Sequence, residues 1–224
     1  MCGRFTQGIS WAEVHAFSQG LDLLLPDSDP EPTYNLCPTQ SAWLIAADGK
    51  QARAQQMRWG LVPSWAKDIK IGASMINARL ETASEKPSFR SAWKSRRCLV
   101  PASGYYEWRE EGGIKQPYYV HDTRGPLLMF AGLWEQWKTP EGESLRTFAI
   151  LTCAAEGAML QLHDRTPVML EGVVMHDWLH GNAEQAAAIA LSAATPDLAW
   201  HKVNRAVSNP RSSGAQLIAP LEAA

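Results

Sequence analysis

Short segments rich in β-branched and aromatic residues follow one another through the middle of this 224-residue chain, and they constrain its fold more than any other feature. Each is bounded by Gly, Pro, Asp or clustered charges, which is typical of strands separated by turns. The predicted strands are Ala42–Ala47, Ala52–Trp59, Cys98–Pro101, Tyr105–Arg109, Pro117–His121, Leu127–Leu133 and Thr147–Cys153. Because they come in runs and do not alternate regularly with helices, we predict an α+β fold with a curved, mainly antiparallel sheet system and peripheral helices.

Three segments favour helices around this core. Ser10 and Glu13 form a capping-box pattern, and Asn182 can cap an alanine-rich helix. The predicted helices run from Ser10 to about Phe17, over Phe89–Lys94 and over Ala183–Ala194. No Gly/Ser-rich linker or internal repeat divides the sequence, and 46% hydrophobic residues suffice for one substantial core. We therefore expect residues 1–224 to form a single compact domain, and we expect it to be a monomer.

Charge is distributed unevenly along a chain whose formal net charge is only -2. Residues 58–97 contain nine Lys or Arg and three Asp or Glu, so this stretch carries +6 and the remainder -8. A local basic region on an otherwise acidic protein is what a phosphate-binding face would look like. The alternative is a solvated surface whose charges point in several directions, and the sequence leaves both open.

The four cysteines favour neither a disulfide framework nor a zinc site. They lie far apart and form no C-x-x-C pair. No N-terminal signal pattern or apolar run of membrane-spanning length is present. We expect a cytoplasmic protein that uses no metal, cofactor or membrane.

The second residue has unusual chemical potential. If the small side chain of Cys2 allows removal of Met1, Cys2 carries a free α-amine beside its thiol, with ordinary pKa values of about 8 and about 8.5. An aldehyde can form a Schiff base with the amine, and the thiol can then close a five-membered thiazolidine. Alone, Cys2 could equally be an accident of where the chain starts.

Two further residues are candidates for proton transfer. Glu107 lies between aromatic residues in Gly-Tyr-Tyr-Glu-Trp, and burial there would raise its pKa. The alternation of a strand cannot say whether Glu107 faces inward, and an outward glutamate is the plainer interpretation. His163 opens the polar loop His-Asp-Arg-Thr-Pro and is the best placed histidine for proton transfer, although an ordinary loop histidine would look the same.

Residues suited to nucleic acid occur in two other places. Asn77 could orient a sugar oxygen and Arg79 could bind a phosphate bidentately, unless Arg79 merely pairs with Glu81. Pro38 and Trp65 could stack on unpaired bases if they lie at the surface. With ten tryptophans in the chain, most must be core residues.

Taken in order, these motifs resemble the SOS response-associated peptidase (SRAP) family across essentially the whole chain. The matching segments are Met1-Cys2-Gly3-Arg4-Phe5, Tyr34-Asn35 with Pro38, Trp59-Gly60 with Pro63, Asn77-Ala78-Arg79 with Glu81-Thr82, Gly104 to Trp108, His163-Asp164-Arg165 with Pro167, and His201 to Asn209. The resemblance implies a protein that crosslinks covalently to abasic sites in single-stranded DNA. It also implies a compact α+β domain with a β-rich, barrel-like core, in agreement with the predicted strands.

The resemblance further implies roles for the residues already singled out. Cys2 would be the nucleophile, Glu107 would position or deprotonate its amine, His163 would move protons, and Asn77 would orient the substrate. The residues implied to contact DNA are Arg4, Pro38, Trp65, Arg79 and Arg165. The segment Ser64-Trp65-Ala66 departs from relatives that carry paired aromatics there, which affects the stacking.

The family's peptidase name implies self-removal of whatever precedes the cysteine. Here only Met1 does so, and a general methionine aminopeptidase could remove it. Two rival functions fit parts of the sequence. An N-terminal-nucleophile amidotransferase also begins Met-Cys-Gly, and a non-catalytic single-stranded DNA or RNA binding module would need only the basic stretch and the aromatics.

Overall fold

The computed structural model describes residues 2–221, and its centre is a closed five-stranded barrel. Its strands pair in the order β11, β10, β7, β4, β5 and then β11 again. Their bounds are β4 (Ser41–Asp48), β5 (Gln51–Trp59), β7 (Arg97–Ala102), β10 (Leu128–Lys138) and β11 (Ser144–Ala154). Neighbours are antiparallel except β5 and β11, which run parallel and close the barrel.

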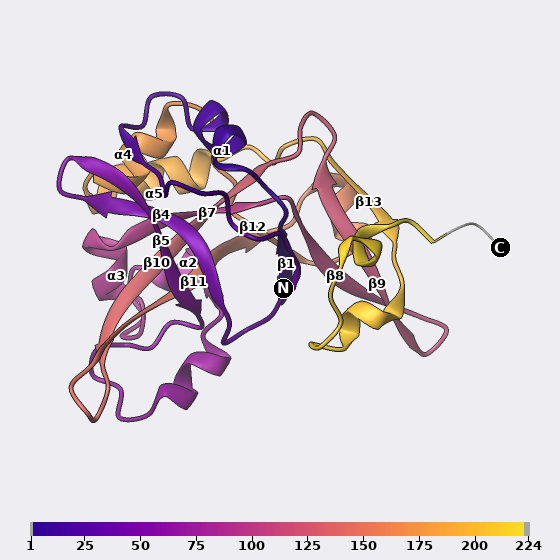
Figure 1. Cartoon of the computed structure of the whole chain (residues 1–224), viewed down its shortest axis with the longest axis horizontal. Helices are drawn as coiled ribbons and strands as arrows, with labels where there is room; N and C mark the ends of the chain where they lie inside the picture. Colours follow the sequence, from indigo (N-terminus) through magenta and orange to yellow (C-terminus); the bar gives the residue numbers. More distant parts are fainter. Residues whose placement is uncertain (1, 222–224) are drawn as a thin grey trace.

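A second, antiparallel sheet lies beside the barrel (Figure 1). Its order is β13, β9, β8, β1, β3, with bounds β1 (Arg4–Gln7), β3 (Thr33–Leu36), β8 (Gly104–Glu111), β9 (Ile114–Asp122) and β13 (Leu198–Lys202). Three short strands complete the β structure: β2 (Leu23–Leu24) pairs with β5, and both β6 (Asn77–Arg79) and β12 (Arg165–Pro167) pair with β11. The barrel strand β11 therefore carries two segments that the sequence analysis singled out.

One glycine lets the chain pass from the barrel into the second sheet. Strand β7 ends at Ala102 and β8 begins at Gly104, so Ser103 alone separates them. A Cβ atom at Gly104 would lie 2.4 Å from the Tyr119 ring and 2.6 Å from the carbonyl oxygen of Val120. Contacts that short are forbidden, so only glycine fits. This corner sets where the rest of β8, including Glu107, comes to lie.

The α-helices lie on the barrel side of the molecule (Figure 1). They are α1 (Trp11–Phe17), α2 (Leu80–Ala83), α3 (Arg90–Ser95), α4 (Val174–His180) and α5 (Ala183–Ser192). The 3-10 helices are η1 (Ile69–Ser74), η2 (Gly157–Gln161), η3 (Arg205–Ser208) and η4 (Ala215–Ile218), and the last two pack against the second sheet. The Ser10–Glu13 capping box at α1 is confirmed, and Asn182 caps α5. Helix α5 ends two residues before the predicted Ala194, because Ala193 is already extended.

Two large apolar clusters stabilise this arrangement. One fills the space between barrel and helices, and Trp93 packs edge-on against Trp178 there. The other joins the barrel interior to β1, where the fully buried Phe5 meets the Trp59 ring edge-on at 5.0 Å. Packing of Phe5 against the barrel holds the N-terminal strand, and thus the residues beside it, in a defined place.

The predicted fold class is confirmed, and each predicted strand corresponds to part of an observed one. The sequence analysis does not predict the short strands β1, β2, β3, β6, β12 and β13. Several contain Asn, Arg or Gln, so hydrophobic patterning does not reveal them, and they form because a neighbouring strand offers an edge. Among residues 2–221, no helix has the length and apolar character needed to cross a membrane.

Part of the basic stretch 58–97 is structural. Arg97 is 2% exposed, and its guanidinium donates to carbonyl oxygens at the ends of α3 and α4, among them Trp93 and Trp178. Arg96 pairs with the buried Glu135 at 2.8 Å. Unsatisfied carbonyls at helix C-termini attract such cations. These two arginines are therefore occupied within the fold.

Candidate active site

Cys2 lies just ahead of β1 and is completely buried. Its thiol donates a long hydrogen bond, 3.7 Å, to the carbonyl oxygen of Arg4. Burial strongly raises the pKa of the Cys2 thiol, and the nearby Glu107 charge raises it further. The thiol is therefore protonated at neutral pH, and any reaction through sulfur needs a group that accepts its proton.

Asn77 holds the backbone of Cys2. Strand β6 runs parallel to β11, with Asn77 opposite Ile150, and this pairing carries the amide to the N-terminal segment. Asn77 Nδ2 donates to the carbonyl oxygen of Cys2 at 2.8 Å. Asn77 Oδ1 is buried and has no hydrogen-bond partner among residues 2–221. A buried acceptor of this kind favours a ligand that brings a donor.

Glu107 faces the interior, which settles what strand alternation left open. Arg4 pairs with Tyr106 and Phe5 with Tyr105, so Glu107 lies next to the residues that precede β1. Its side chain is buried, with 2% of the residue exposed. Burial raises the pKa of Glu107 to about 7, and the Asp164 carboxylate adds to the rise. A carboxyl with this pKa can both take up and release a proton near neutral pH.

His163 lies between η2 and β12 and is held by the backbone of its own loop. The backbone N–H of Arg165 donates to His163 Nδ1 at 2.9 Å. A backbone N–H can only donate, so Nδ1 must accept this hydrogen bond. The neutral ring therefore carries its proton on Nε2. Asp164 Oδ1 lies 2.8 Å from the same Nδ1, a contact that favours the protonated ring. Burial lowers the pKa of His163, so the neutral form is favoured at pH 7.

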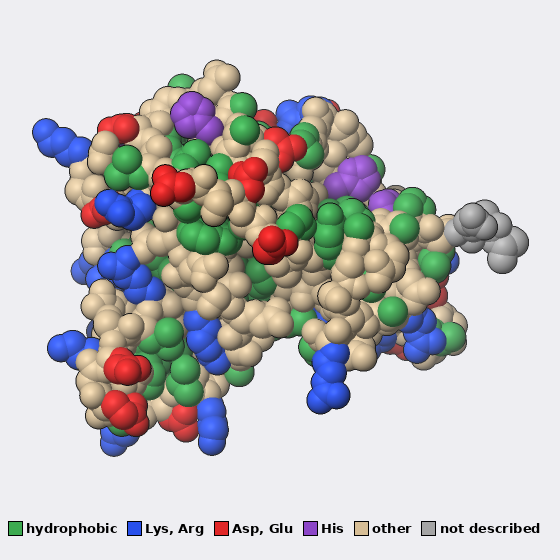
Figure 2. Space-filling model, viewed as in Figure 1, with side chains coloured by type: hydrophobic (Ala, Val, Ile, Leu, Met, Phe, Trp, Pro, Cys, Tyr) green, Lys and Arg blue, Asp and Glu red, His purple; other side chains and the backbone are tan. Residues whose placement is uncertain are grey.

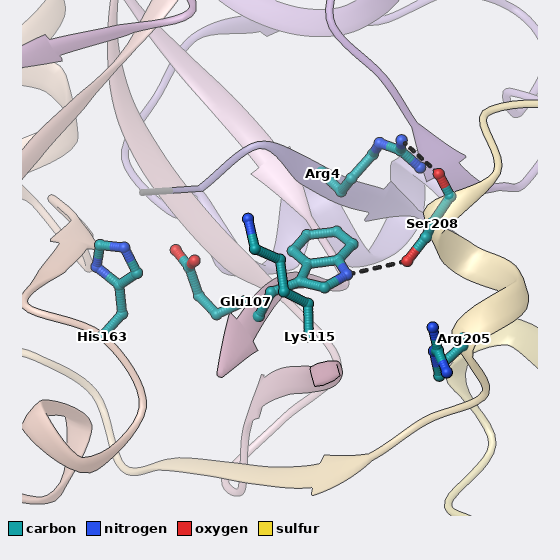
Figure 3. A pocket seen from close by; sticks show the side chains of 7 residues that line it. Arg4, Glu107, Lys115, His163, Arg205 and Ser208 are labelled. Carbon is teal, nitrogen blue, oxygen red and sulfur yellow. Dashed lines mark hydrogen bonds between the residues drawn. The ribbon is translucent and has the colours of Figure 1, made fainter. Parts of the chain in front are cut away.

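A cavity of about 770 Å³ opens beside these groups. Figure 3 shows Glu107 and His163 pointing toward one another at one end, with Arg4, Lys115 and Arg205 toward the other. The outline of the molecule is indented between the barrel and the second sheet, with Lys and Arg side chains on both flanks (Figure 2). The cavity thus joins proton-transfer groups to a cationic wall, a combination suited to an anionic substrate.

Arg4 is held firmly within that wall. Its Nη1 donates to Asn35 Oδ1 at 2.7 Å and to the carbonyl oxygen of Val207 at 2.5 Å, and its guanidinium lies 5.9 Å from the Trp108 ring centre. Trp108 Nε1 in turn donates to Ser208 Oγ at 3.0 Å. These contacts tie β1 to the C-terminal segment and fix the position of the Arg4 charge.

The other predicted DNA-binding arginines differ in their surroundings. Arg79, the last residue of β6, is exposed. Arg165 instead makes a bidentate pair with Glu81, at 2.6 and 2.9 Å, and donates to the carbonyl oxygen of Thr152 at 2.6 Å. Glu81 therefore pairs with Arg165 and not within its own segment. The role of Arg165 in DNA binding stays a prediction. It would require the Arg165 guanidinium to bind a phosphate as well as Glu81 and the Thr152 carbonyl oxygen.

The two predicted stacking residues lie in separate loops. Trp65 follows β5 and is 58% exposed, the larger part of an aromatic ring left to solvent. Pro38 follows β3 and is half-buried. The exposed Trp65 side chain is therefore accessible to a flat apolar partner.

Sequence reasoning missed several residues of the cavity. Trp108, Lys115, Arg205 and Ser208 all line it. Lys115 comes from β9 and the last two from the η3 segment. Pairing in the second sheet places β9 beside β8, and Arg4 contacts the η3 segment through hydrogen bonds to the carbonyl oxygens of Val207 and Ser208. Trp108, Arg205 and Ser208 lie within segments that resemble the family, but no local pattern places them in this cavity, because their proximity depends on contacts between distant parts of the chain.

Comparison with known proteins identifies the family of this chain. The family model described as SOS response associated peptidase (SRAP) matches residues 1–210. The chain belongs to the SRAP family. It is 38% identical over 223 residues to the abasic site processing protein YoqW of Bacillus subtilis, covering 97% of this chain and 99% of that protein. It is 31% identical to the abasic site processing protein YedK of Escherichia coli, covering 99% and 100%.

Solved structures show the same SRAP fold. A crystal structure of a protein from Bacteroides thetaiotaomicron superposes with a TM-score of 0.80 at 25% identity, covering 98% of this chain and all of that one. A phage-related protein from Bordetella bronchiseptica gives a TM-score of 0.71 at 28% identity, covering 91% and 95%. The arrangement of barrel and second sheet is therefore shared with experimental structures.

Proposed function

We propose that this SRAP protein processes abasic sites in single-stranded DNA by forming a covalent thiazolidine link through Cys2 once Met1 has been removed. One observation carries the proposal: Cys2, Asn77, Glu107 and His163 converge although the chain separates them widely. The names of the relatives, abasic site processing proteins, support the substrate. An abasic site offers an aldehyde in its ring-opened form, and an aminothiol is a specific trap for aldehydes.

The reaction balances without a cofactor. The Cys2 amine adds to the aldehyde carbon, and the carbinolamine loses water to give an imine. The thiol sulfur then bonds to the imine carbon, and its proton passes to the imine nitrogen, which closes the thiazolidine. One water leaves for each link formed, and no oxidant or reductant is needed.

The geometry suits each proton transfer in this sequence. Glu107, with a pKa of about 7, can accept a proton from the Cys2 ammonium and return it later. His163 carries its proton on Nε2 and can protonate the oxygen that leaves as water. Asn77 fixes the Cys2 carbonyl, and its buried Oδ1 can accept a hydrogen bond from the amine or from a sugar hydroxyl.

The DNA is held by the arginines and the surface aromatic. Arg4, Arg79 and Arg165 bind phosphates beside the lesion, while Pro38 and Trp65 contact the neighbouring bases. Residues 1–224 act as one domain and as a monomer. Met1, which lies outside the described residues, is removed by the protein itself or by an aminopeptidase, as the family's peptidase name suggests.

Paired variants of Cys2 test the chemistry. With an abasic oligonucleotide, the wild type should give an adduct that survives denaturation and has the mass of protein without Met1 plus DNA minus one water. Cys2→Ser keeps the amine, so its imine should be captured only when borohydride is added. A stable adduct from Cys2→Ser without reductant would overturn the thiazolidine mechanism.

The same assay distinguishes the rival functions. A binding module would retain DNA without any covalent product, in the presence or absence of borohydride. An amidotransferase would release ammonia from glutamine, and its activity would not require DNA. Intact mass of the purified protein, before and after exposure to the oligonucleotide, separates the crosslinking protein from both rivals, and ammonia release separates the amidotransferase from the binding module.

A further inference from the structure

A second cavity, of about 410 Å³, lies where strands β5 and β11 diverge. The two strands pair in parallel at Arg58 with Thr147 and at Trp59 with Phe148. Ahead of these pairs, Gln55 to Met57 line one side of the cavity and Ser144 to Arg146 line the other. The opening is therefore built into the way the barrel closes. None of its lining residues belongs to the cavity beside Glu107.

The lining is polar and cationic. It contains two arginines, three glutamines and two serines, together with one methionine and one leucine, and no Asp or Glu. Glutamine and serine can donate hydrogen bonds, while the arginines supply two positive charges. Such a wall repels cations and offers an oxyanion many donors.

Arg58 provides the observation that points to a ligand. Its Nη1 is buried and has no hydrogen-bond partner among residues 2–221. This nitrogen carries two N–H donors, and burying them unpaired is costly. Burial also lowers the pKa of Arg58, which reflects the charge left without compensation. A bound anion would satisfy these donors and remove the cost.

Arg146 is positioned on the facing strand. Its guanidinium lies 5.4 Å from the Trp134 ring centre, and its Nη1 donates to Gln55 Oε1 across the cavity. Stacking and this hydrogen bond hold the Arg146 guanidinium in place, and its remaining N–H groups can donate to a ligand. One arginine from β5 and one from β11 therefore line the same cavity.

We propose that this cavity is a phosphate-binding site, in which Arg58 and Arg146 hold the phosphate oxygens and the glutamine and serine side chains complete the hydrogen bonds. The phosphate is either a free one, inorganic or on a nucleotide, or a backbone phosphate of bound DNA. Because the cavity shares no lining residue with the site beside Cys2, occupancy does not depend on the crosslinking chemistry.

Thermal unfolding of the full chain tests the site directly. Sodium phosphate should raise the Tm of the wild type saturably, by roughly 3 °C at 10 mM, relative to sodium chloride of equal ionic strength. Arg58→Gln should lose this shift. Arg53→Gln is the matched control, since Arg53 lies on the same strand but is exposed and paired with Asp48, and it should keep the shift. Equal shifts in all three proteins, or none in the wild type, would overturn the proposal.

Arg146→Gln is a second test of the same site, which remains informative if Arg58→Gln does not fold. Arg146 is exposed, so its variant should fold, with an unchanged circular dichroism spectrum. It should bind phosphate roughly tenfold more weakly, as expected for losing one charge-assisted contact. Unchanged phosphate affinity in folded Arg146→Gln would contradict the two-arginine site.

Binding to undamaged single-stranded DNA identifies the source of the phosphate. If DNA supplies it, Arg58→Gln should lower the salt slope of log affinity by about 0.7, and added phosphate should compete with DNA. If the ligand is free, the slope stays the same while the phosphate-induced Tm shift is lost. In both cases the rate of crosslinking at saturating DNA should equal that of the wild type, so failure of this site and failure of the proposed chemistry have different signatures.

Discussion

Asn77 Nδ2 donates a 2.8 Å hydrogen bond to the carbonyl oxygen of Cys2, which joins a short strand of the barrel side to the N-terminal residue that carries the proposed chemistry. Strand β6 is only three residues long, and its pairing with β11 is what places Asn77 there. The N-terminus is thereby oriented from outside its own sheet.

Asn77→Ala should slow crosslinking by about 10²-fold while leaving the mass of the final adduct unchanged. Without the amide, the Cys2 backbone loses the bond that fixes it, and small misplacements of a nucleophile have effects of this size. Single-turnover rates on denaturing gels measure it. Asn182→Ala, which alters only the exposed cap of α5, is the control and should crosslink at the wild-type rate. A wild-type rate in Asn77→Ala would remove Asn77 from the mechanism.

Glu107→Gln should change how stability depends on pH. The folded protein holds the Glu107 proton up to a pKa of about 7, above the ordinary 4.5. The stability from burying neutral Glu107 is therefore fully present below about pH 4.5, and it is lost as pH rises through about 7. Glutamine stays neutral, so the variant should gain stability relative to wild type between these values, by at most about 3 kcal/mol at pH 8.

Urea unfolding at pH 5 and pH 8 checks this, with Glu110→Gln as the control. Glu110 is exposed on the same strand, so its variant should follow the wild-type pH profile. The crosslinking rate of Glu107→Gln should also lose its rise through pH 7. Parallel stability profiles in wild type and Glu107→Gln would mean that Glu107 does not titrate near neutrality.

His163→Ala should reduce the crosslinking rate by roughly 10²–10⁴-fold, the usual effect of removing a positioned acid or base. The adduct should still form on long incubation, because the aminothiol supplies the bonds. His176→Ala is the matched control, since His176 is exposed on α4 and should have no effect. Equal rates in the two variants would assign His163 a structural role.

Arg79→Ala should weaken binding to single-stranded DNA of any sequence and lower the salt slope of log affinity by about 0.7. Arg79 is exposed, so stability should stay the same. Arg165→Ala should by contrast also destabilise the fold, because it leaves Glu81 and the Thr152 carbonyl without their donor. Anisotropy titrations at several salt concentrations, combined with Tm, separate the two. An unchanged salt slope in Arg79→Ala would end its proposed role as a phosphate ligand.

Trp65→Ala should cost about 1–3 kcal/mol of DNA affinity if its exposed ring stacks on a base. Because 58% of Trp65 is already exposed, folding stability should change little. Leu160→Ala, at 60% exposure, removes a comparable apolar side chain elsewhere and should leave affinity unchanged. Equal affinities of both variants and wild type would show that Trp65 does not contact DNA.

Much of the fold could be predicted because hydrophobic patterning and caps act locally. The predicted strands Ala52–Trp59 and Thr147–Cys153 lie within β5 and β11, and the Ser10–Glu13 pattern begins α1. The reactive groups of the site could also be recognised, since an amine, a thiol, a carboxyl or an imidazole group belongs to a single residue. The roles of these residues remain predictions.

The partners of the site residues could not be predicted. Glu81 was considered as a partner of Arg79, yet it pairs with Arg165 across 84 positions of sequence. Arg97 counted toward a basic face and is instead buried against the ends of two helices. Local sequence does not encode which distant donor reaches which acceptor.

The sequence by itself therefore determined the α+β class, the positions of most long strands along the chain and the reactive groups available at Cys2, Glu107 and His163. Only the tertiary structure decided that Glu107 faces inward with a raised pKa, that Asn77 holds Cys2, and that β5 and β11 diverge around Arg58. The physical reason is that secondary structure follows from neighbours along the chain, whereas burial and electrostatic coupling depend on which distant segments pack together.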